Sequence, residues 1–296
     1  MPLGNELLFR KFNCMASIIS KVYELAKYWL PPRMIHIVKQ RIFGFGYFGN
    51  YSSWEEARAK SGSYANPEIL SKTKDALLKV KTGEAVYERD SVLFDKVHHS
   101  WPLLACLQRV ALENEGRLSV LDFGGSLGSS YFQCRAFLPN LDKLEWSVVE
   151  QKDHVNCGKH ELEDDILAFY YKVEECLKVR KPNVILFSGV IQYLEKPYDL
   201  VASILNYGFK NVIIDRTPFL KGKTDMITVQ KVSPKIYDVS YPSWIFGYSK
   251  FTAFFSKNYR LLAEFDNPGA PIFLSRGRLI EFKGFMWKLC GSRRFM

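Results

Sequence analysis

The sequence lacks the cysteine pairs, long apolar runs and repeats that mark several classes of protein. Its six cysteines include no C-x-x-C pair, which argues against a disulfide framework and suits a reducing cytosol. The uncharged run at residues 12–20 is too short to span a bilayer, and the charges after it make a poor signal peptide. We therefore expect a cytoplasmic protein, and 296 residues suit one α/β domain with additions.

The net positive charge of the chain comes from its two ends, and the middle has none. Residues 1–42 hold seven Lys or Arg against two Glu, and residues 276–296 hold six against one, while the residues between are balanced at 28 against 28. Nucleic-acid binding would place this charge on the folded domain, so we expect no nucleic-acid partner. Basic ends suit peripheral contact with an anionic membrane. An amphipathic helix expected at residues 14–30 could lie on such a surface, although packing on the protein itself is favoured.

A short apolar run, residues 118–121, ends in Asp122 and breaks into a glycine-rich turn. The run predicts a buried strand, and the periodic residues at 127–137 predict the helix that follows. In the dinucleotide fingerprint G-x-G-x-x-G a glycine follows the strand, but this chain has Phe123 there, with an acid before it. A carboxylate suits a cationic ligand such as S-adenosylmethionine and suits the pyrophosphate of NAD poorly.

Strand and helix signals alternate after residue 116, which is the βαβ rhythm of an α/β fold. We expect a Rossmann-like, doubly wound and mostly parallel sheet whose ligand lies at the carboxyl ends of the strands. A helix is expected at residues 198–207. The seven expected strands are residues 118–121, 146–149, 168–171, 184–187, 212–214, 228–232 and 279–282.

The region before this sheet has a different composition. Glycine and aromatic residues at 43–52 predict a linker, and Ser53 followed by Glu56 predicts a capped helix start. Helices are expected from there to about residue 112. The expected domains are a basic N-terminal segment at 1–42, a helical cap at 43–116, a core at 117–285 and a basic tail at 286–296.

Two sets of residues carry a resemblance to known families. Residues 121–128 resemble the first motif of class I S-adenosylmethionine-dependent methyltransferases, D-x-G-x-G-x-G, with Ser126 in place of the central glycine. Over residues 45–270 the chain also resembles a bacterial family of methyltransferases associated with surface-polysaccharide genes. The resemblance implies a seven-stranded methyltransferase fold and S-adenosylmethionine as cofactor, and it leaves the acceptor unassigned. The strings that carry the second resemblance are residues 87–91, 100–104, 149–151, 215–219 and 240–242.

Candidate cofactor contacts follow several of the expected strands. Glu150 closes the second strand, where a carboxylate can accept both ribose hydroxyls, although a solvated acid is the alternative. Ser188 and Gly189 follow a buried strand, which indicates close backbone approach, and the resemblance places them at the methionine part. Arg89 could pair with the cofactor carboxylate or form a surface salt bridge. The predicted contacts are Arg89, Asp122, Gly124, Gly125, Ser126, Gly128, Glu150, Gln151, Ser188 and Gly189.

Candidate catalytic residues are few. Methyl transfer requires an aligned nucleophile and, for a hydroxyl, removal of its proton. Asp215 and Arg216 follow the fifth strand and could serve, or could form an ion pair that fixes the loop. His99 is available as a base near pH 7, with a structural role as the alternative. The string from His154 to His160 has three possible metal ligands, but their helical spacing does not converge and we expect no metal site.

Three functions from different classes follow. The leading hypothesis is a methyltransferase acting on oxygen or nitrogen of a small acceptor, with a glycan or nucleotide-sugar precursor suggested by the resemblance. The second is a catalytically degenerate scaffold in surface-polysaccharide assembly, motivated by Ser126 and by the lack of one obvious base. A nicotinamide-dependent enzyme is disfavoured by Asp122 and Phe123.

Overall fold

The computed structural model describes most of the chain after residue 43. The expected helix at 14–30, the N-terminal segment around it and His99 lie outside the described residues. The described residues are Met34, 44–62, 67–89, 91–94, 100–233, 236, 238–267, 272–274 and 278–291.

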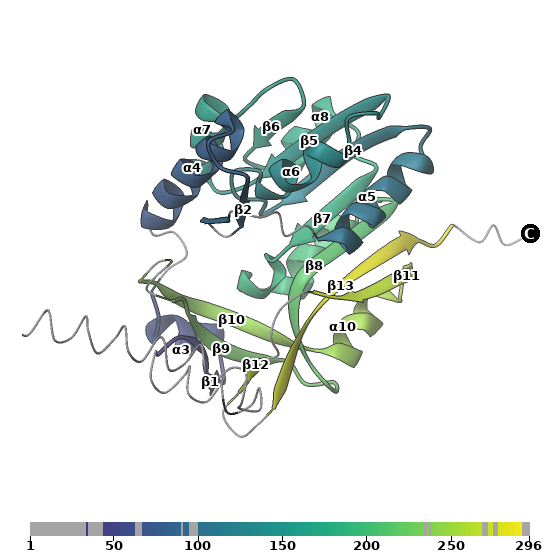
Figure 1. The fold of residues 1–296 in the computed structure, drawn as a ribbon. Helices are drawn as coiled ribbons and strands as arrows, with labels where there is room; N and C mark the ends of the chain where they lie inside the picture. The colour runs from purple at the N-terminus through teal and green to yellow at the C-terminus, as the bar shows by residue number, and fades with distance from the viewer. Residues whose placement is uncertain are drawn as a thin grey trace, which may run out of the picture.

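A mostly parallel sheet of seven strands forms the centre of the molecule (Figure 1). Only β13 runs against its neighbours, β8 and β11. The expected doubly wound, seven-stranded fold is therefore confirmed. In spatial order the strands are β6 (Leu167–Tyr170), β5 (Lys143–Val149), β4 (Arg117–Phe123), β7 (Val184–Ser188), β8 (Asn211–Leu220), β13 (Leu279–Leu289) and β11 (Tyr259–Asp266).

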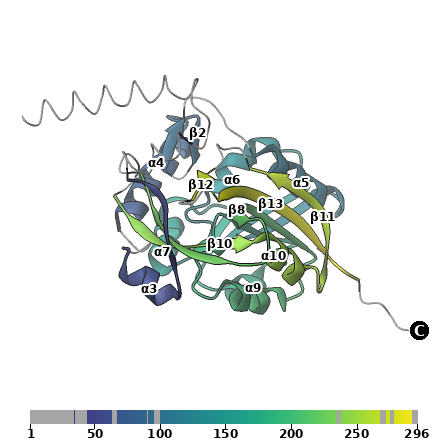
Figure 2. The same ribbon diagram turned by 90° about the horizontal axis from the view of Figure 1, so that it is seen from below.

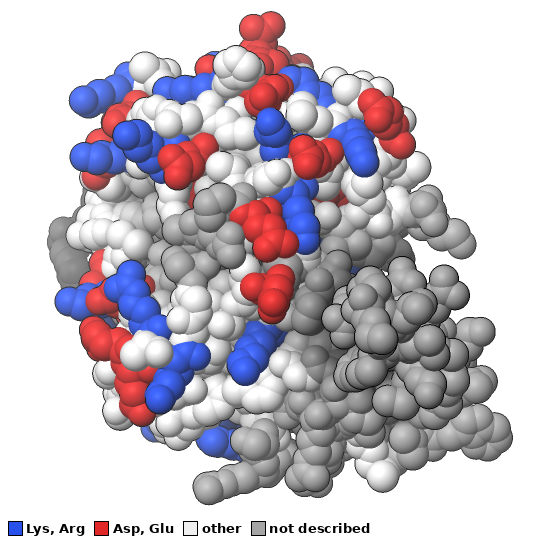
Figure 3. Space-filling view, turned by 90° about the vertical axis from the view of Figure 1, so that its left-hand side faces the viewer, with Lys and Arg blue, Asp and Glu red and all other residues white. Residues whose placement is uncertain are grey.

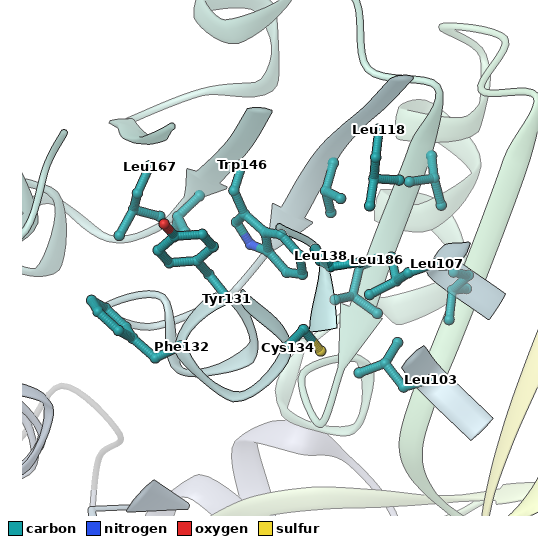
Figure 4. Packing of buried hydrophobic residues seen from close by; sticks show 14 of the residues in the cluster. Leu103, Leu107, Leu118, Tyr131, Phe132, Cys134, Leu138, Trp146, Leu167 and Leu186 are labelled. Carbon is teal, nitrogen blue, oxygen red and sulfur yellow. The ribbon is translucent and has the colours of Figure 1, made fainter. Parts of the chain in front are cut away.

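Helices cover both faces of this sheet, because successive residues of each strand point to opposite faces. Val120 packs in one core cluster and Leu121 in the other. Figure 4 shows the first cluster, in which the indole of Trp146 packs against Tyr131 at 5.8 Å between ring centroids. The first cluster contains residues of α4 (Pro67–Thr82), α5 (Trp101–Leu112), α6 (Ser129–Cys134) and α7 (Lys152–Glu161), and the second contains residues of α8 (Val173–Val179), α9 (Pro197–Leu205) and α10 (Tyr248–Phe255).

An antiparallel addition extends the sheet beyond the end of β8. It consists of β1 (Gly46–Tyr51), β9 (Met226–Lys231) and β10 (Ser240–Gly247), and β10 pairs with β8 through Phe246 and Phe219. Helix α3 (Trp54–Ala59) covers it, with Trp54 stacked on Trp244 at 6.0 Å. Figure 1 shows the addition beneath the parallel sheet, and Figure 2 views the molecule from below, the side on which the addition lies.

Several sequence expectations differ from these elements. The linker at 43–52 contains β1, and the expected strand at 228–232 belongs to the addition through β9. Three further strands were not expected, namely β10, β11 and the two-residue β12 (Ile272–Phe273), which pairs with β13. The last strand runs to Leu289 with Trp287 buried, so the residues from 286 onward begin inside the sheet.

A short hairpin interrupts the region expected to be helical. Strands β2 (Tyr87–Arg89) and β3 (Val92–Phe94) form it between α4 and α5. The predicted capped helix start is confirmed, because the Ser53 hydroxyl accepts a bond from the Glu56 amide at 3.1 Å. The side-chain amide of Gln133 on α6 donates to the carbonyl of Glu88 at 2.8 Å, which ties the hairpin to the parallel domain.

Charges on the described surface are mixed. Figure 3 shows Lys and Arg interspersed with Asp and Glu over the described part of one face. Within the described ranges, no helix has the length and apolar character needed to cross a membrane.

Candidate functional site

The turn after β4 has an unusual backbone. Gly124, Ser126 and Gly128 all have positive φ, at +68°, +54° and +89°. A Cβ at Gly124 would meet the side chain of Val190 at 2.2 Å, and its amide donates to the carbonyl of Val149 at 2.9 Å. The turn is therefore held between the ends of β5 and β7, and glycine is required at 124 for both conformation and space.

Asp122 lies beneath this turn and is 0 % exposed. One carboxylate oxygen accepts a hydrogen bond from the indole of Trp146 at 3.1 Å, whereas Oδ1 has no partner among the described residues. A Cβ at Gly125 would lie 2.5 Å from the Asp122 carboxyl carbon, so the side chain packs directly against the turn. Burial raises the pKa of Asp122 to about 7 despite the Trp146 bond and the charge of Arg216.

Glu150 follows the adjacent strand, and its position beside Asp122 is set by the parallel register of β4 and β5. Burial raises the pKa of Glu150 to about 7, and the charge of Asp122 adds to this effect. The backbone amide of Gln151 is its hydrogen-bond donor, while Gln151 itself is exposed at the start of α7. Two carboxyl groups of raised pKa thus share one edge of the sheet, a pattern typical of functional sites.

The loop after β7 forms the next part of this edge. Gly189 has φ +65° and its amide donates to the carbonyl of Asp215 at 2.9 Å. Gln192 is 2 % exposed, and its amide nitrogen donates to the carbonyl of Arg216 at 3.3 Å. Its Oε1 has no partner in the described part of the chain. This loop therefore offers a buried acceptor oxygen close to the ends of β7 and β8.

Asp215 is buried, and both of its carboxylate oxygens have hydrogen-bond donors. Its Oδ1 accepts from the side-chain amide of Asn267 at 2.5 Å and its Oδ2 from the Ser188 hydroxyl at 3.1 Å. Arg216 Nε lies 3.9 Å from the same Oδ2 and donates to the Ser188 hydroxyl at 3.3 Å. The strand continues to Leu220 rather than ending here, but its pairing with β7 does end at Asp215. These contacts support the alternative in which the ion pair fixes the loop.

Asn267 is a site residue that the sequence did not reveal. It also accepts a bond from the backbone amide of Arg216 at 3.0 Å, which holds Arg216 at φ +51°. A positive φ is costly for arginine, so the surrounding contacts maintain this backbone. Asn267 comes directly after β11, and because β11 itself was not expected, no sequence signal placed it near Asp215.

A small pocket lies beside these residues and encloses about 40 Å³. Arg89, predicted as a cofactor contact, lines it together with Asp215 and Arg216. Ser100, at the start of α5, lines it too, and its hydroxyl has no partner among the described residues. The remaining lining residues are Tyr87, Gln133 and Asn267.

Other candidates lie elsewhere. Tyr241, in the string at residues 240–242, is buried in β10 and packs edge-to-face on Tyr193 at 5.1 Å. His154 is buried in α7 whereas His160 is exposed, so the helical spacing separates them as expected. Within the described ranges no cluster of three or more His, Cys, Asp or Glu could hold a metal ion.

Comparisons with known proteins give only remote likenesses. No protein-family model matches the chain, and no curated protein matches it. Among solved structures, the N-terminal domain of EvdMO1, determined with S-adenosylhomocysteine and D-fucose, is 13 % identical over 76 % of this chain and 97 % of its own, with TM-score 0.41. A methyltransferase from Clostridium acetobutylicum is 10 % identical over 64 % of this chain and 91 % of its own, with TM-score 0.40. The N-methyltransferase NodS from Bradyrhizobium japonicum is 10 % identical over 64 % and 86 %, with TM-score 0.38. Similarities this weak do not establish a function.

Proposed function

We propose that this protein is an S-adenosylmethionine-dependent methyltransferase that acts on oxygen or nitrogen of a small acceptor. The observation that carries the proposal is the pair of carboxyl groups, Asp122 and Glu150, at the ends of adjacent parallel strands. Burial raises the pKa of both to about 7, and the charge of Asp122 adds to this effect at Glu150. A ligand that brings positive charge and hydroxyl donors to this edge would stabilise both carboxylates.

S-adenosylmethionine fits this pair of carboxyl groups. Its ribose offers two hydroxyls to Glu150, and its amino group and sulfonium supply positive charge near Asp122, whose Oδ1 lacks a partner among the described residues. After β7, Gly189 has a positive φ and would let the ligand approach the backbone closely. The buried Oε1 of Gln192 offers a further hydrogen-bond acceptor there. The pyrophosphate of NAD would instead add negative charge beside two acids.

The chain's own residues would chiefly align the reactants. The bound cofactor supplies an electrophilic methyl group, whose transfer to the acceptor leaves S-adenosylhomocysteine and releases the acceptor's proton. Ser188, Asp215 and Arg216 form a fixed hydrogen-bonded wall at the adjacent strand ends. Such fixed groups can supply a large part of a rate acceleration by orientation alone.

Calorimetric titration tests the cofactor assignment. S-adenosylmethionine and S-adenosylhomocysteine should bind the wild type, and Glu150→Gln should weaken both by tenfold or more, because charge-assisted bonds to two hydroxyls are lost. Glu145→Gln is the matched control. Glu145 lies on the same strand at its other end and is held by Ser119 and Lys143. Equal affinities in both variants, or preferential binding of NAD, would contradict the proposal.

The degenerate-scaffold hypothesis has one observation in its favour. Both carboxylate oxygens of Asp215 already accept hydrogen bonds within the protein. A scaffold would bind the cofactor without turnover. Transfer of an isotopically labelled methyl group to an acceptor panel separates the two functions. The resemblance suggests glycan and nucleotide-sugar precursors for the panel.

A further inference from the structure

The pocket beside Asp215 lies where the pairing of β8 with β7 ends, and several hydrogen-bond donors line it. Both oxygens of Asp215 already accept bonds from Asn267 and Ser188, and the amide oxygen of Asn267 accepts from the Arg216 backbone. Each of these acceptor oxygens therefore already has one donor. Donor groups also line the pocket.

Two guanidinium groups and one hydroxyl supply those donors. Arg89 and Arg216 line the pocket, and among the described residues Arg89 contacts the ring of Phe94 but forms no ion pair. The Ser100 hydroxyl is buried without a partner in the described part of the chain. Burial raises the pKa of the Tyr87 phenol, and the charges of Arg89 and Arg216 both act to lower it. Both charges therefore lie near Tyr87, which lines the same pocket. Two positive charges and one aspartate thus line the same pocket.

The size of the pocket limits what can enter it. A volume of 40 Å³ holds roughly three water-sized groups, since one water needs about 10–15 Å³ measured in this way. This is the size of a carboxylate or of part of a phosphate, and it is too small for a sugar ring. The pocket therefore suits the charged end of a larger molecule.

We infer that this pocket binds the carboxylate or phosphate of the methyl acceptor, with Arg89 and Arg216 as its anion ligands and the Ser100 hydroxyl as a further donor. The inference rests on the proposed function. Arginine pairs with both anions in a two-bonded fork.

The order of the strands assigns the pocket to the acceptor. Along the edge the strands run β5, β4, β7, β8. A methyl donor held at Glu150 and Asp122 occupies the ends of the first two, which leaves the part of β8 at Asp215, where its pairing with β7 ends, for the second substrate. Arg89 is thereby assigned to the acceptor instead of to the cofactor carboxylate, the contact expected from the sequence.

The experiment titrates sodium acetate and inorganic phosphate into the full chain, with and without saturating S-adenosylhomocysteine. We expect one or both anions to bind equally well in the two conditions, and the stronger of them identifies the acceptor group as carboxylate or phosphate. Arg89→Gln should weaken anion binding about tenfold or more and leave S-adenosylhomocysteine affinity within twofold. Arg89→Lys, which keeps the charge but not the fork, should fall between.

Arg117→Gln is the matched control, since Arg117 begins β4 at the opposite edge of the sheet and pairs only with exposed Glu115 at 3.3 Å in the described chain. Two results would overturn the inference. The first is that S-adenosylhomocysteine abolishes anion binding and that Arg89→Gln binds S-adenosylhomocysteine more weakly. This result would assign the pocket to the methyl donor. The other is absent anion binding, or equal binding in the Arg89 and Arg117 variants. Failure of S-adenosylhomocysteine to bind at all would count against the proposed function, and the titration without it still tests the pocket.

Discussion

Replacing Asp122 by asparagine should make the free protein more stable at alkaline pH while weakening cofactor binding. The pKa of Asp122 lies at about 7 in the folded protein, against 3.8 for an ordinary aspartate. The folded state therefore holds this proton more tightly than the unfolded state between these pH values. Stability must fall as pH rises through that window, and the full loss is present above pH 7.

The magnitude follows from the same pKa. A change from 3.8 to about 7 corresponds to a loss of the order of 4 kcal/mol, since each pH unit is worth 1.36 kcal/mol. Asparagine keeps an oxygen for the Trp146 indole, but its NH₂ replaces the unpartnered Oδ1 and costs about 1–3 kcal/mol. We therefore expect a net stabilisation of about 1–3 kcal/mol at pH 8 that fades toward pH 5.

Urea unfolding followed by tryptophan fluorescence from pH 5 to 8 measures this effect. Asp199→Asn, an exposed acid in the first turn of α9, is the control and should run parallel to the wild type. Because the charge of Asp122 also raises the pKa of Glu150, the double variant with Glu150→Gln should gain less than the sum of the single gains. The reasoning is refuted if the Asp122→Asn curve runs parallel to the wild-type curve over the whole range.

The remaining predictions concern the turn and the basic end. Ser126→Gly should stabilise the protein by about 0.5–1 kcal/mol in urea unfolding, because Ser126 has φ +54° and this conformation costs a non-glycine residue about 1–2 kcal/mol. Gly124→Ala should destabilise the protein by several kcal/mol, because the new Cβ would lie 2.2 Å from the side chain of Val190. The opposite order of stabilities would contradict the role given to the turn. Deletion of residues 1–42 should lower affinity for anionic vesicles in a sedimentation assay and leave cofactor affinity unchanged; unchanged vesicle binding would exclude this segment as a membrane contact.

The sequence predicted the parallel part of the fold because its strands are buried on both faces. In β4 and β7 nearly every residue is buried, which produces continuous apolar runs that end in a polar residue. Asp122, near the end of β4, and Glu150, directly after β5, could be assigned to one site because the carboxyl ends of parallel strands share an edge. Their spacing in the sequence did not matter, since the register places them together.

The missed strands fail this pattern for identifiable reasons. β11 is an edge strand with most of its residues exposed, so it carries no apolar run. β10 is buried but contains Pro242, which usually argues against a strand inside a sheet. Asn267 and Ser100 reach the pocket only through tertiary packing of these and other elements. Sequence spacing holds no information about such contacts.

The hydrogen bonds that Asp215 accepts affect how a methyl transfer could proceed at this site. To act as a base, Asp215 would have to accept a proton on an oxygen that already accepts from Asn267 or Ser188, and protonation would weaken that oxygen as an acceptor. The same bonds fix Arg216, through Asn267 and Ser188, at the wall of the pocket. In the proposed reaction, Asp215 would serve by fixing Arg216, which in turn would hold the anionic end of the acceptor. We therefore propose alignment of the reactants as the contribution of this edge, and an acceptor whose nucleophile needs little help in losing a proton.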